Sequence, residues 1–101
     1  MLDNFRTYKI AVDFYAICQT ISCKGSLKDQ LERASASIAL NLAEGRGKPT
    51  IRDQKRYFHI AFGSARECQA ILTLLNHKDS PAWRTLDHLA ASLYRLLKNA
   101  K

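Results

Sequence analysis

The stretch NLAEGRGKPT, residues 41–50, decides the fold, because it is either a phosphate-binding loop or a turn between two helices. A phosphate-binding loop of the form G-x-x-x-x-G-K-[ST] follows a strand and places a hydroxyl directly after its lysine. Here Pro49 follows Lys48, and the apolar residues before Gly45 recur at helical intervals. The stretch is therefore predicted to be a turn that joins two helices.

The residues of this turn fit the two helix ends that it would join. Gly45 can adopt the left-handed conformation that ends a helix, and Pro49 cannot continue one. Thr50, with Asp53 three residues later, is typical of an N-cap that begins the next helix. We therefore expect a helical hairpin with a basic tip.

Apolar residues recur every three or four positions in four segments, which predicts four amphipathic helices. The first is expected over residues 5–21 and ends at SCKGS. The second begins at a cap formed by Ser26 with Asp29 and runs to about residue 44. The third covers about 51–76, and Ser80 followed by Pro81 begins the fourth. No segment has the alternating pattern of a strand.

The expected core consists of the apolar stripes of these helices. The stripe residues are Phe5, Tyr8, Val12, Tyr15 and Cys18 in the first helix, Leu27, Leu31, Ala34, Ile38 and Leu42 in the second, Phe58, Ala61, Phe62, Ala65, Ile71, Leu72 and Leu75 in the third, and Trp83, Leu86, Leu89, Ala90, Leu93 and Leu97 in the fourth. The stripe of the first helix is widened by Ala11, Phe14 and Ile21, and the second helix has a second apolar patch of Ala36, Leu40 and Ala43. Because these stripes are wider than one bundle interior needs, self-association is expected.

Short connections between four amphipathic helices favour antiparallel neighbours. The prediction is an all-α fold, a single domain over residues 1–101 that forms an antiparallel up-down-up-down four-helix bundle. A coiled-coil pair is the alternative, but no helix keeps a strict heptad repeat for long enough. A chain of 101 residues can bury one core and is too small for two domains.

Composition narrows the classes of function. The chain is 47% hydrophobic without a long apolar run, so no membrane-spanning helix is expected. Asp3 and Arg6 lie where a secretory signal needs an apolar run, which favours a cytoplasmic protein. The three cysteines form no CxxC pair and the three histidines are scattered. We therefore expect no disulfide framework, no metal and no cofactor.

The net charge of +7 is predicted to lie at one end of the bundle, which holds the N-terminus, the hairpin and the C-terminus. Ten basic residues, here called the basic end, gather there: Arg6, Lys9, Arg46, Lys48, Arg52, Lys55, Arg56, Arg95, Lys98 and Lys101. Against the three acidic residues Asp3, Glu44 and Asp53 they leave a balance of +7, and the rest of the chain has six basic and six acidic residues.

The basic end is the predicted nucleic-acid-binding site, because Lys and Arg side chains bind phosphates. Tyr8 and Tyr57 lie near it in the predicted bundle and could stack on bases. The alternative is that both tyrosines belong to the core and the lysines serve only solubility.

The run QLERASASIALNLAEGRGKPTIRDQKRYFHIAFGSARE, residues 30–67, carries a set of residues at uninterrupted spacing. They are Gln30, Leu31, Arg33, Ala34, Ser37, Ile38, Asn41, Ala43, Glu44, Gly45, Gly47, Thr50, Asp53, Arg56, Ile60, Ala61, Gly63, Ser64 and Glu67. In these positions the chain resembles a bacterial four-helix-bundle family first noted as products of intervening sequences in 23S ribosomal RNA genes. That family is similar in fold to the accessory protein of diversity-generating retroelements, a basic homopentamer that works with a reverse transcriptase and its RNA.

The resemblance implies a homopentameric ring and RNA binding, with a reverse transcriptase as a candidate partner. It implies no known reaction.

A row of polar residues is predicted to line the facing sides of the hairpin. Its members are Arg33, Ser37, Asn41 and Glu44 on the second helix and Ser64 and Glu67 on the third. One interpretation is a catalytic or ligand-binding cluster. We favour a buried structural seam in which Arg33 pairs with Glu67 and Gly63 allows close helix approach, because a buried charge needs a partner. No nucleophile, oriented base and oxyanion donor occur together, so no catalytic residue is expected.

The sequence therefore predicts a non-enzymatic, homo-oligomeric protein that binds RNA or DNA through its basic end without strong sequence specificity. It would chaperone a structured RNA or assist a retroelement reverse transcriptase. The alternative is a protein-interaction scaffold whose basic end docks an acidic protein surface. A metal- or thiol-dependent enzyme is not supported, because no ligand set or triad occurs in the sequence.

Overall fold

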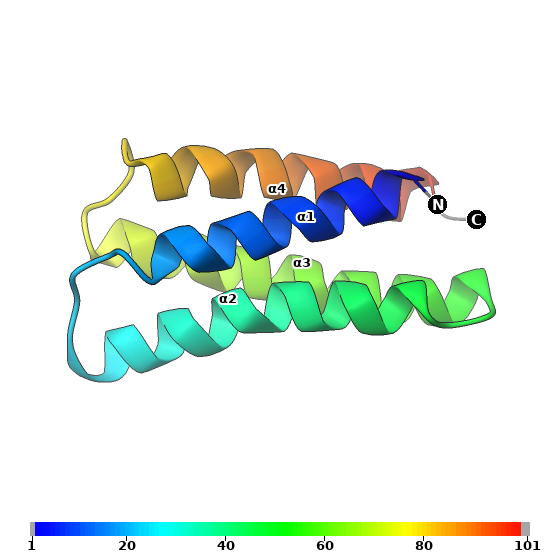
Figure 1. The fold of residues 1–101 in the computed structure, drawn as a ribbon, viewed down its shortest axis with the longest axis horizontal. Helices are drawn as coiled ribbons and strands as arrows, with labels where there is room; N and C mark the ends of the chain where they lie inside the picture. Colours follow the sequence, from blue (N-terminus) through cyan, green and yellow to red (C-terminus); the bar gives the residue numbers. More distant parts are fainter. Residues whose placement is uncertain (1, 100–101) are drawn as a thin grey trace.

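A computed structural model describes residues 2–99, which form four α-helices: α1 (Leu2–Cys18), α2 (Gly25–Arg46), α3 (Ile51–Leu74) and α4 (Pro81–Asn99). Helices α1 and α3 each pack beside both α2 and α4, and across residues 2–99 the diagonal helices make no contact. The start of α1, the α2–α3 turn and the end of α4 share one end of the bundle (Figure 1). The predicted all-α up-down-up-down four-helix bundle is confirmed.

Two of the predicted helix caps form as expected. Thr50 Oγ1 accepts the backbone N–H of Asp53 at 3.2 Å, which fixes the first turn of α3. Ser80 Oγ accepts the N–H of Trp83 at 3.1 Å, and Pro81 is the first residue of α4. The predicted Ser26 cap is wrong, because α2 already begins at Gly25, whose positive φ of 67° lets the chain turn into the helix.

The predicted role of Gly45 as a left-handed helix end is also wrong. Helix α2 continues to Arg46, and Gly45 is buried inside it, facing α3. A Cβ at Gly45 would lie 2.7 Å from Phe58 Cε1 and 3.1 Å from Tyr57 Cβ. The close approach of α2 and α3 that was expected at Gly63 therefore occurs at Gly45, since Gly63 is exposed with open space around it.

The core follows the predicted stripes in three of the four helices. Fully buried apolar residues at predicted stripe positions are Leu31, Ala34, Ile38 and Leu42 in α2, Phe58, Ala61, Ala65, Ile71 and Leu72 in α3, and Leu86, Leu89 and Leu93 in α4. The remaining predicted stripe residues of these helices are half-buried at the edges of the core. Periodicity alone therefore located most of the interior.

The prediction for α1 is right in part. Its buried face consists of Asn4, Thr7, Ala11, Phe14 and Cys18, so the predicted Ala11, Phe14 and Cys18 belong to the core, whereas Phe5 and Val12 are 43% and 42% exposed. Thr7 is buried because its Oγ1 hydrogen-bonds Ser92 Oγ of α4 at 2.6 Å. A search for apolar periodicity missed only the two polar residues of this face, Asn4 and Thr7.

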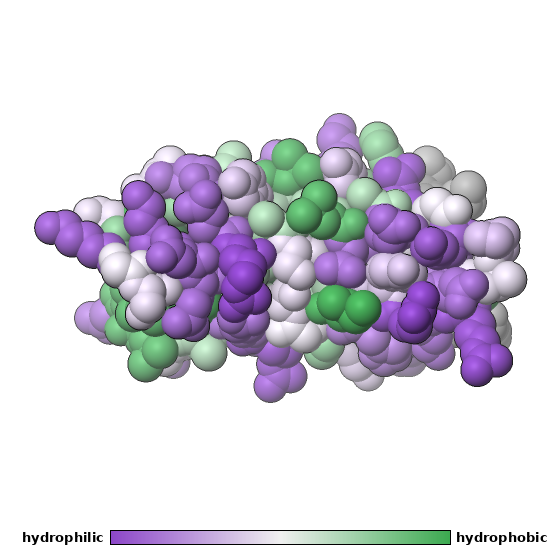
Figure 2. Space-filling model, turned by 90° about the horizontal axis from the view of Figure 1, so that it is seen from below, coloured by the Kyte–Doolittle hydropathy of each residue, from purple (hydrophilic) through white to green (hydrophobic). Residues whose placement is uncertain are grey.

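The additional apolar patch on α2 lies outside the core, with Leu40 68% exposed. On the face seen in Figure 2, from the side where α2 lies in Figure 1, hydrophobic side chains form separate spots among hydrophilic ones. No described helix combines the length and hydropathy that a membrane span requires.

Replacing Gly45 with alanine is expected to destabilise the bundle, because the new Cβ forces the buried Phe58 ring to move. Overpacking of this kind costs about 1–3 kcal/mol, which exceeds the roughly 1 kcal/mol that alanine gains over glycine in a helix. Urea unfolding followed by circular dichroism measures the net loss, expected at about 1 kcal/mol.

Gly63→Ala is the matched control in the neighbouring helix, because nothing lies within 4 Å of its missing Cβ. This variant is expected to gain about 0.5–1 kcal/mol of stability. Equal stabilisation by both substitutions would contradict the close contact at Gly45.

Candidate nucleic-acid interface

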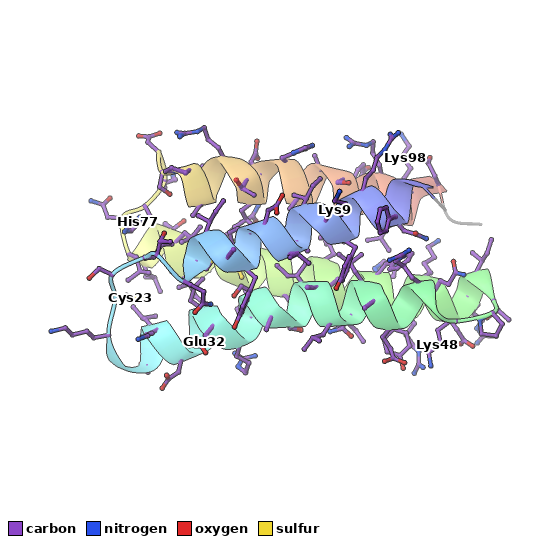
Figure 3. The ribbon with its side chains drawn as sticks, in the orientation of Figure 1. Lys9, Cys23, Glu32, Lys48, His77 and Lys98 are labelled. Atoms are coloured by element: carbon purple, nitrogen blue, oxygen red, sulfur yellow. The ribbon has the colours of Figure 1, made fainter. Side chains whose placement is uncertain are left out.

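The structure describes nine of the ten residues predicted for the basic end, and all four helices contribute to it. They are Arg6 and Lys9 of α1, Arg46 of α2, Lys48 of the turn, Arg52, Lys55 and Arg56 of α3, and Arg95 and Lys98 of α4. Lys101 lies outside the described residues. Lys48 and Lys98 lie at the hairpin end, whereas Cys23 and His77 lie at the opposite end (Figure 3). The basic residues are thus gathered by the topology.

A cation–aromatic cluster joins α1 to α2 at this end. The Arg46 guanidinium lies 4.8 Å from the centroid of the Phe5 ring and 5.8 Å from that of Tyr8. Lys9 Nζ lies 5.8 Å from the Phe5 ring. Phe5, which sequence analysis assigned to the core, is therefore a partly exposed ring that holds two cations in place.

Tyr57 organises a second cluster at the hairpin. Lys48 Nζ lies 5.2 Å from its ring centroid and the Arg56 guanidinium lies 5.0 Å from it. Both Tyr57 and Tyr8 are half-buried, so neither alternative drawn from the sequence holds fully. The accessible stacking partner for a base is the cation–aromatic pair, because an Arg plane stacks on bases as an aromatic ring does.

Hydrogen bonds fix the turn that carries these cations. Gln54 Nε2 of α3 donates to the Lys48 carbonyl oxygen at 2.8 Å, and the Lys48 N–H donates to the Gly45 carbonyl at 3.1 Å. Lys48 Nζ also pairs with Glu44 Oε2 at 3.2 Å. Glu44 therefore neutralises a basic residue of the turn, and in the described residues it makes no contact with the polar row to which it was assigned.

The polar row between α2 and α3 forms, but it is not buried throughout. Arg33 Nη2 and Glu67 Oε2 lie 2.6 Å apart, as predicted, yet these side chains are 63% and 37% exposed. An ion pair this exposed contributes about 0–1 kcal/mol. The expectation of a buried charge pair is wrong, because both long side chains reach out to solvent.

The inner part of the row is a hydrogen-bonded set of neutral groups. The hydroxyls of Ser37 and Ser64 lie 2.9 Å apart, and Asn41 Nδ2 donates to the Ser37 carbonyl oxygen at 2.9 Å and to Ser37 Oγ at 3.1 Å. The Ser37–Ser64 bond crosses from α2 to α3, whereas both Asn41 bonds stay within α2 and hold Ser37 in place. The geometry is that of a helix-pairing contact.

An open pocket of about 670 Å³ lies at the same end, between α1, α3 and α4. Its lining includes the cations Arg6, Lys9 and Arg95 and the apolar side chains of Phe58 and Leu96. The pocket could not be found from the sequence, because it depends on how three helices separate at their ends. The nearest available signal was the pair of polar residues Asn4 and Ser92, which lie on buried faces near the pocket.

The buried thiols are held in their protonated form. Burial raises the pKa of Cys18 to about 12, and a hydrogen bond with Ser35 offsets only part of this effect. Burial raises the pKa of Cys68 as well, and the nearby Cys18 adds to the increase. Both thiols pack as small apolar residues. In the part of the chain that the structure describes, no group of three His, Cys, Asp or Glu side chains is placed to hold a metal ion.

Comparison with known proteins gives one match. The model of the family described as 23S rRNA-intervening sequence protein matches residues 5–100, which is nearly the whole chain. No curated protein and no solved structure matches it.

Thiol labelling is expected to separate the three cysteines. Near pH 8 a thiol with a pKa of about 12 is thiolate in only about one molecule in ten thousand, so Cys18 should resist an aromatic disulfide reagent. Cys68 should resist it for the same reason, and the half-buried Cys23 should react first. Fast labelling of all three in the folded protein, with a Cys23→Ser variant as control, would contradict the burial.

Proposed function

The chain belongs to the 23S rRNA-intervening sequence protein family, and we propose that it is a non-enzymatic protein that binds structured RNA through its basic end. One observation carries this proposal: the described basic residues of that end outnumber its described acidic residues, Asp3, Glu44 and Asp53, by nine to three. Charge of one sign gathered on one surface attracts a polyanion, and the affinity falls steeply with salt.

The side chains of the basic end suit phosphate contacts with little sequence preference. Lys and Arg side chains bind the backbone of a nucleic acid, whereas sequence is read by rigid groups that reach base edges. Exposed Arg52, Arg56 and Lys98 fit the first type of contact. The cation–aromatic clusters at Phe5 and Tyr57 add surfaces on which unpaired bases can stack, and such bases are common in loops of structured RNA.

We further propose that the protein acts as a homo-oligomer, with a homopentamer as the preferred state. Support comes from exposed apolar side chains on the outer sides of α2 and α3: Leu40, Ile60 and Leu74 are 68%, 47% and 71% exposed. Burying these groups between copies would be favourable. A ring of copies would concentrate the charge further, and a reverse transcriptase that uses the bound RNA is a candidate partner.

An interaction scaffold is the second candidate function. Phe5 and Ile51 are each 43% exposed at the basic end, so apolar groups lie among the cations. A protein partner with an acidic rim around an apolar centre would complement such a surface.

Charge reversal at the basic end is expected to abolish most RNA binding. In Arg52→Glu/Lys98→Glu each substitution lowers the charge by two, so the net charge falls from +7 to +3. Fluorescence anisotropy with a labelled RNA stem-loop should show affinity at least about tenfold weaker, because two phosphate contacts are replaced by repulsion. The slope of log affinity against log salt should also fall by about 0.7–0.9 for each lost contact.

The control variant Lys24→Glu/Arg66→Glu has the same net charge of +3 but changes residues outside the basic end. The side chains of Lys24 and Arg66 make no hydrogen bond or ion pair with the described residues, so the fold should persist. Equal loss of binding in both variants would mean that total charge matters and its placement does not. Failure of the wild type to bind RNA at low salt would overturn the proposal and favour a protein partner.

A further inference from the structure

We propose that the pocket between α1, α3 and α4 binds one unpaired nucleotide of the RNA, with its base inside and its phosphate at the rim. The inference rests on the proposed RNA binding and specifies what the basic end recognises. Its three supports are the size and floor of the pocket, the charge of its rim, and a side-chain amide in its lining that makes no hydrogen bond with a described residue.

The pocket has the size and floor that a nucleotide base requires. Its volume of about 670 Å³ lies within the roughly 300–1,000 Å³ typical of small-molecule sites. Its accessible apolar floor comes from the half-buried Ile10 and Leu96, above Phe58, which is only 3% exposed. A flat base can lie against these apolar groups, which a free phosphate ion cannot use.

The rim of the pocket favours an anion. Arg6 and Lys9 of α1 and Arg95 of α4 are exposed and line it, and its described lining residues include no Asp or Glu. Basic side chains therefore come from two helices, so a phosphate at the mouth can be reached from both sides. An uncharged apolar ligand would leave this rim unused.

Asn4 adds a polar group, its side-chain amide, to the lining of the pocket. Its side chain lines the pocket, is 7% exposed, and makes no hydrogen bond with any described residue. Among the described residues no fully buried side-chain nitrogen or oxygen lacks a hydrogen-bond partner, so the Asn4 amide is reached by solvent and is open to a ligand in the pocket. The neighbouring Ser92 hydroxyl already bonds Thr7.

The chemistry of an Asn amide fits a base edge. It presents one donor and one acceptor side by side, the pattern that pairs with the N6 and N7 atoms of adenine. A base on the apolar floor, an amide at its edge and a phosphate at the cationic rim together describe a nucleotide. Adenosine monophosphate is therefore the probe of choice.

The test compares three probes on the full-length, isotope-labelled protein by NMR titration: adenosine monophosphate, adenosine and inorganic phosphate. Adenosine monophosphate is expected to bind at least about tenfold tighter than either of the others, because only it meets both the floor and the rim. Its strongest shift changes should be at the amides of Asn4, His88 and Ser92, which line the pocket.

Variants of the lining residues test which side chains contact the nucleotide. Asn4→Ala and Arg95→Gln are each expected to weaken the binding of adenosine monophosphate about tenfold, the usual effect of losing one hydrogen-bonded or charged partner. Arg52→Gln is the control, since Arg52 belongs to the basic end but does not line the pocket. This variant should bind RNA more weakly and bind adenosine monophosphate with unchanged affinity.

Two results would overturn the inference: adenosine monophosphate binding no tighter than phosphate, or shift changes confined to residues that do not line the pocket, such as 19–32 and 75–84. If the RNA stem-loop still binds in either case, the proposed function stands and only the pocket is wrong. If neither RNA nor mononucleotide binds at low salt, both are wrong.

Discussion

The close packing of α2 against α3 at Gly45 is the contact on which the candidate interface depends. A Cβ at this position would lie 2.7 Å from Phe58 Cε1, so any larger residue forces the Phe58 ring to move from its place between the helices. The contact holds the end of α2 against the beginning of α3 and so brings the basic residues of the turn beside those of α3. Phe58 also lines the pocket, which connects the packing of the hairpin directly to the shape of the site.

Gathering like charges at one end of a small bundle costs free energy, and several contacts reduce that cost. Arg46 lies against Phe5, while Lys48 and Arg56 lie against Tyr57. Negative ring faces partly screen these cations from one another without neutralising them. Lys48 also pairs with Glu44. The remaining positive potential faces solvent, where a polyanion can reach it, and the opposite end of the chain balances its basic and acidic residues.

The sequence predicted the elements that local rules control, and it failed where a residue acts through another helix. Periodicity identified α2, α3 and α4, and the hydroxyl caps at Thr50 and Ser80 marked two helix starts. The face of α1 was assigned only in part: Ala11, Phe14 and Cys18 were found, but Thr7 was missed, because its partner on α4 lies 85 residues away in the chain. Gly45 was misassigned for a similar reason, since its role depends on Phe58.

The site was likewise predictable only in part. The register of the α2–α3 hairpin predicted the Arg33–Glu67 pair, but the exposure of this pair depends on how far the two side chains extend beyond the interface. The basic end follows from topology plus charge counting, whereas the pocket with its Asn4 amide requires three helices in place.

Photo-crosslinking of bound RNA, followed by mass spectrometry of the crosslinked peptides, tests the central claim most directly. The account predicts that crosslinks concentrate at the start of α1, around Phe5 and Tyr8, and in residues 46–58 and 92–98, all of which lie at the basic end. Crosslinks spread evenly along the chain, or concentrated at residues 19–32 and 75–84 of the opposite end, would contradict it.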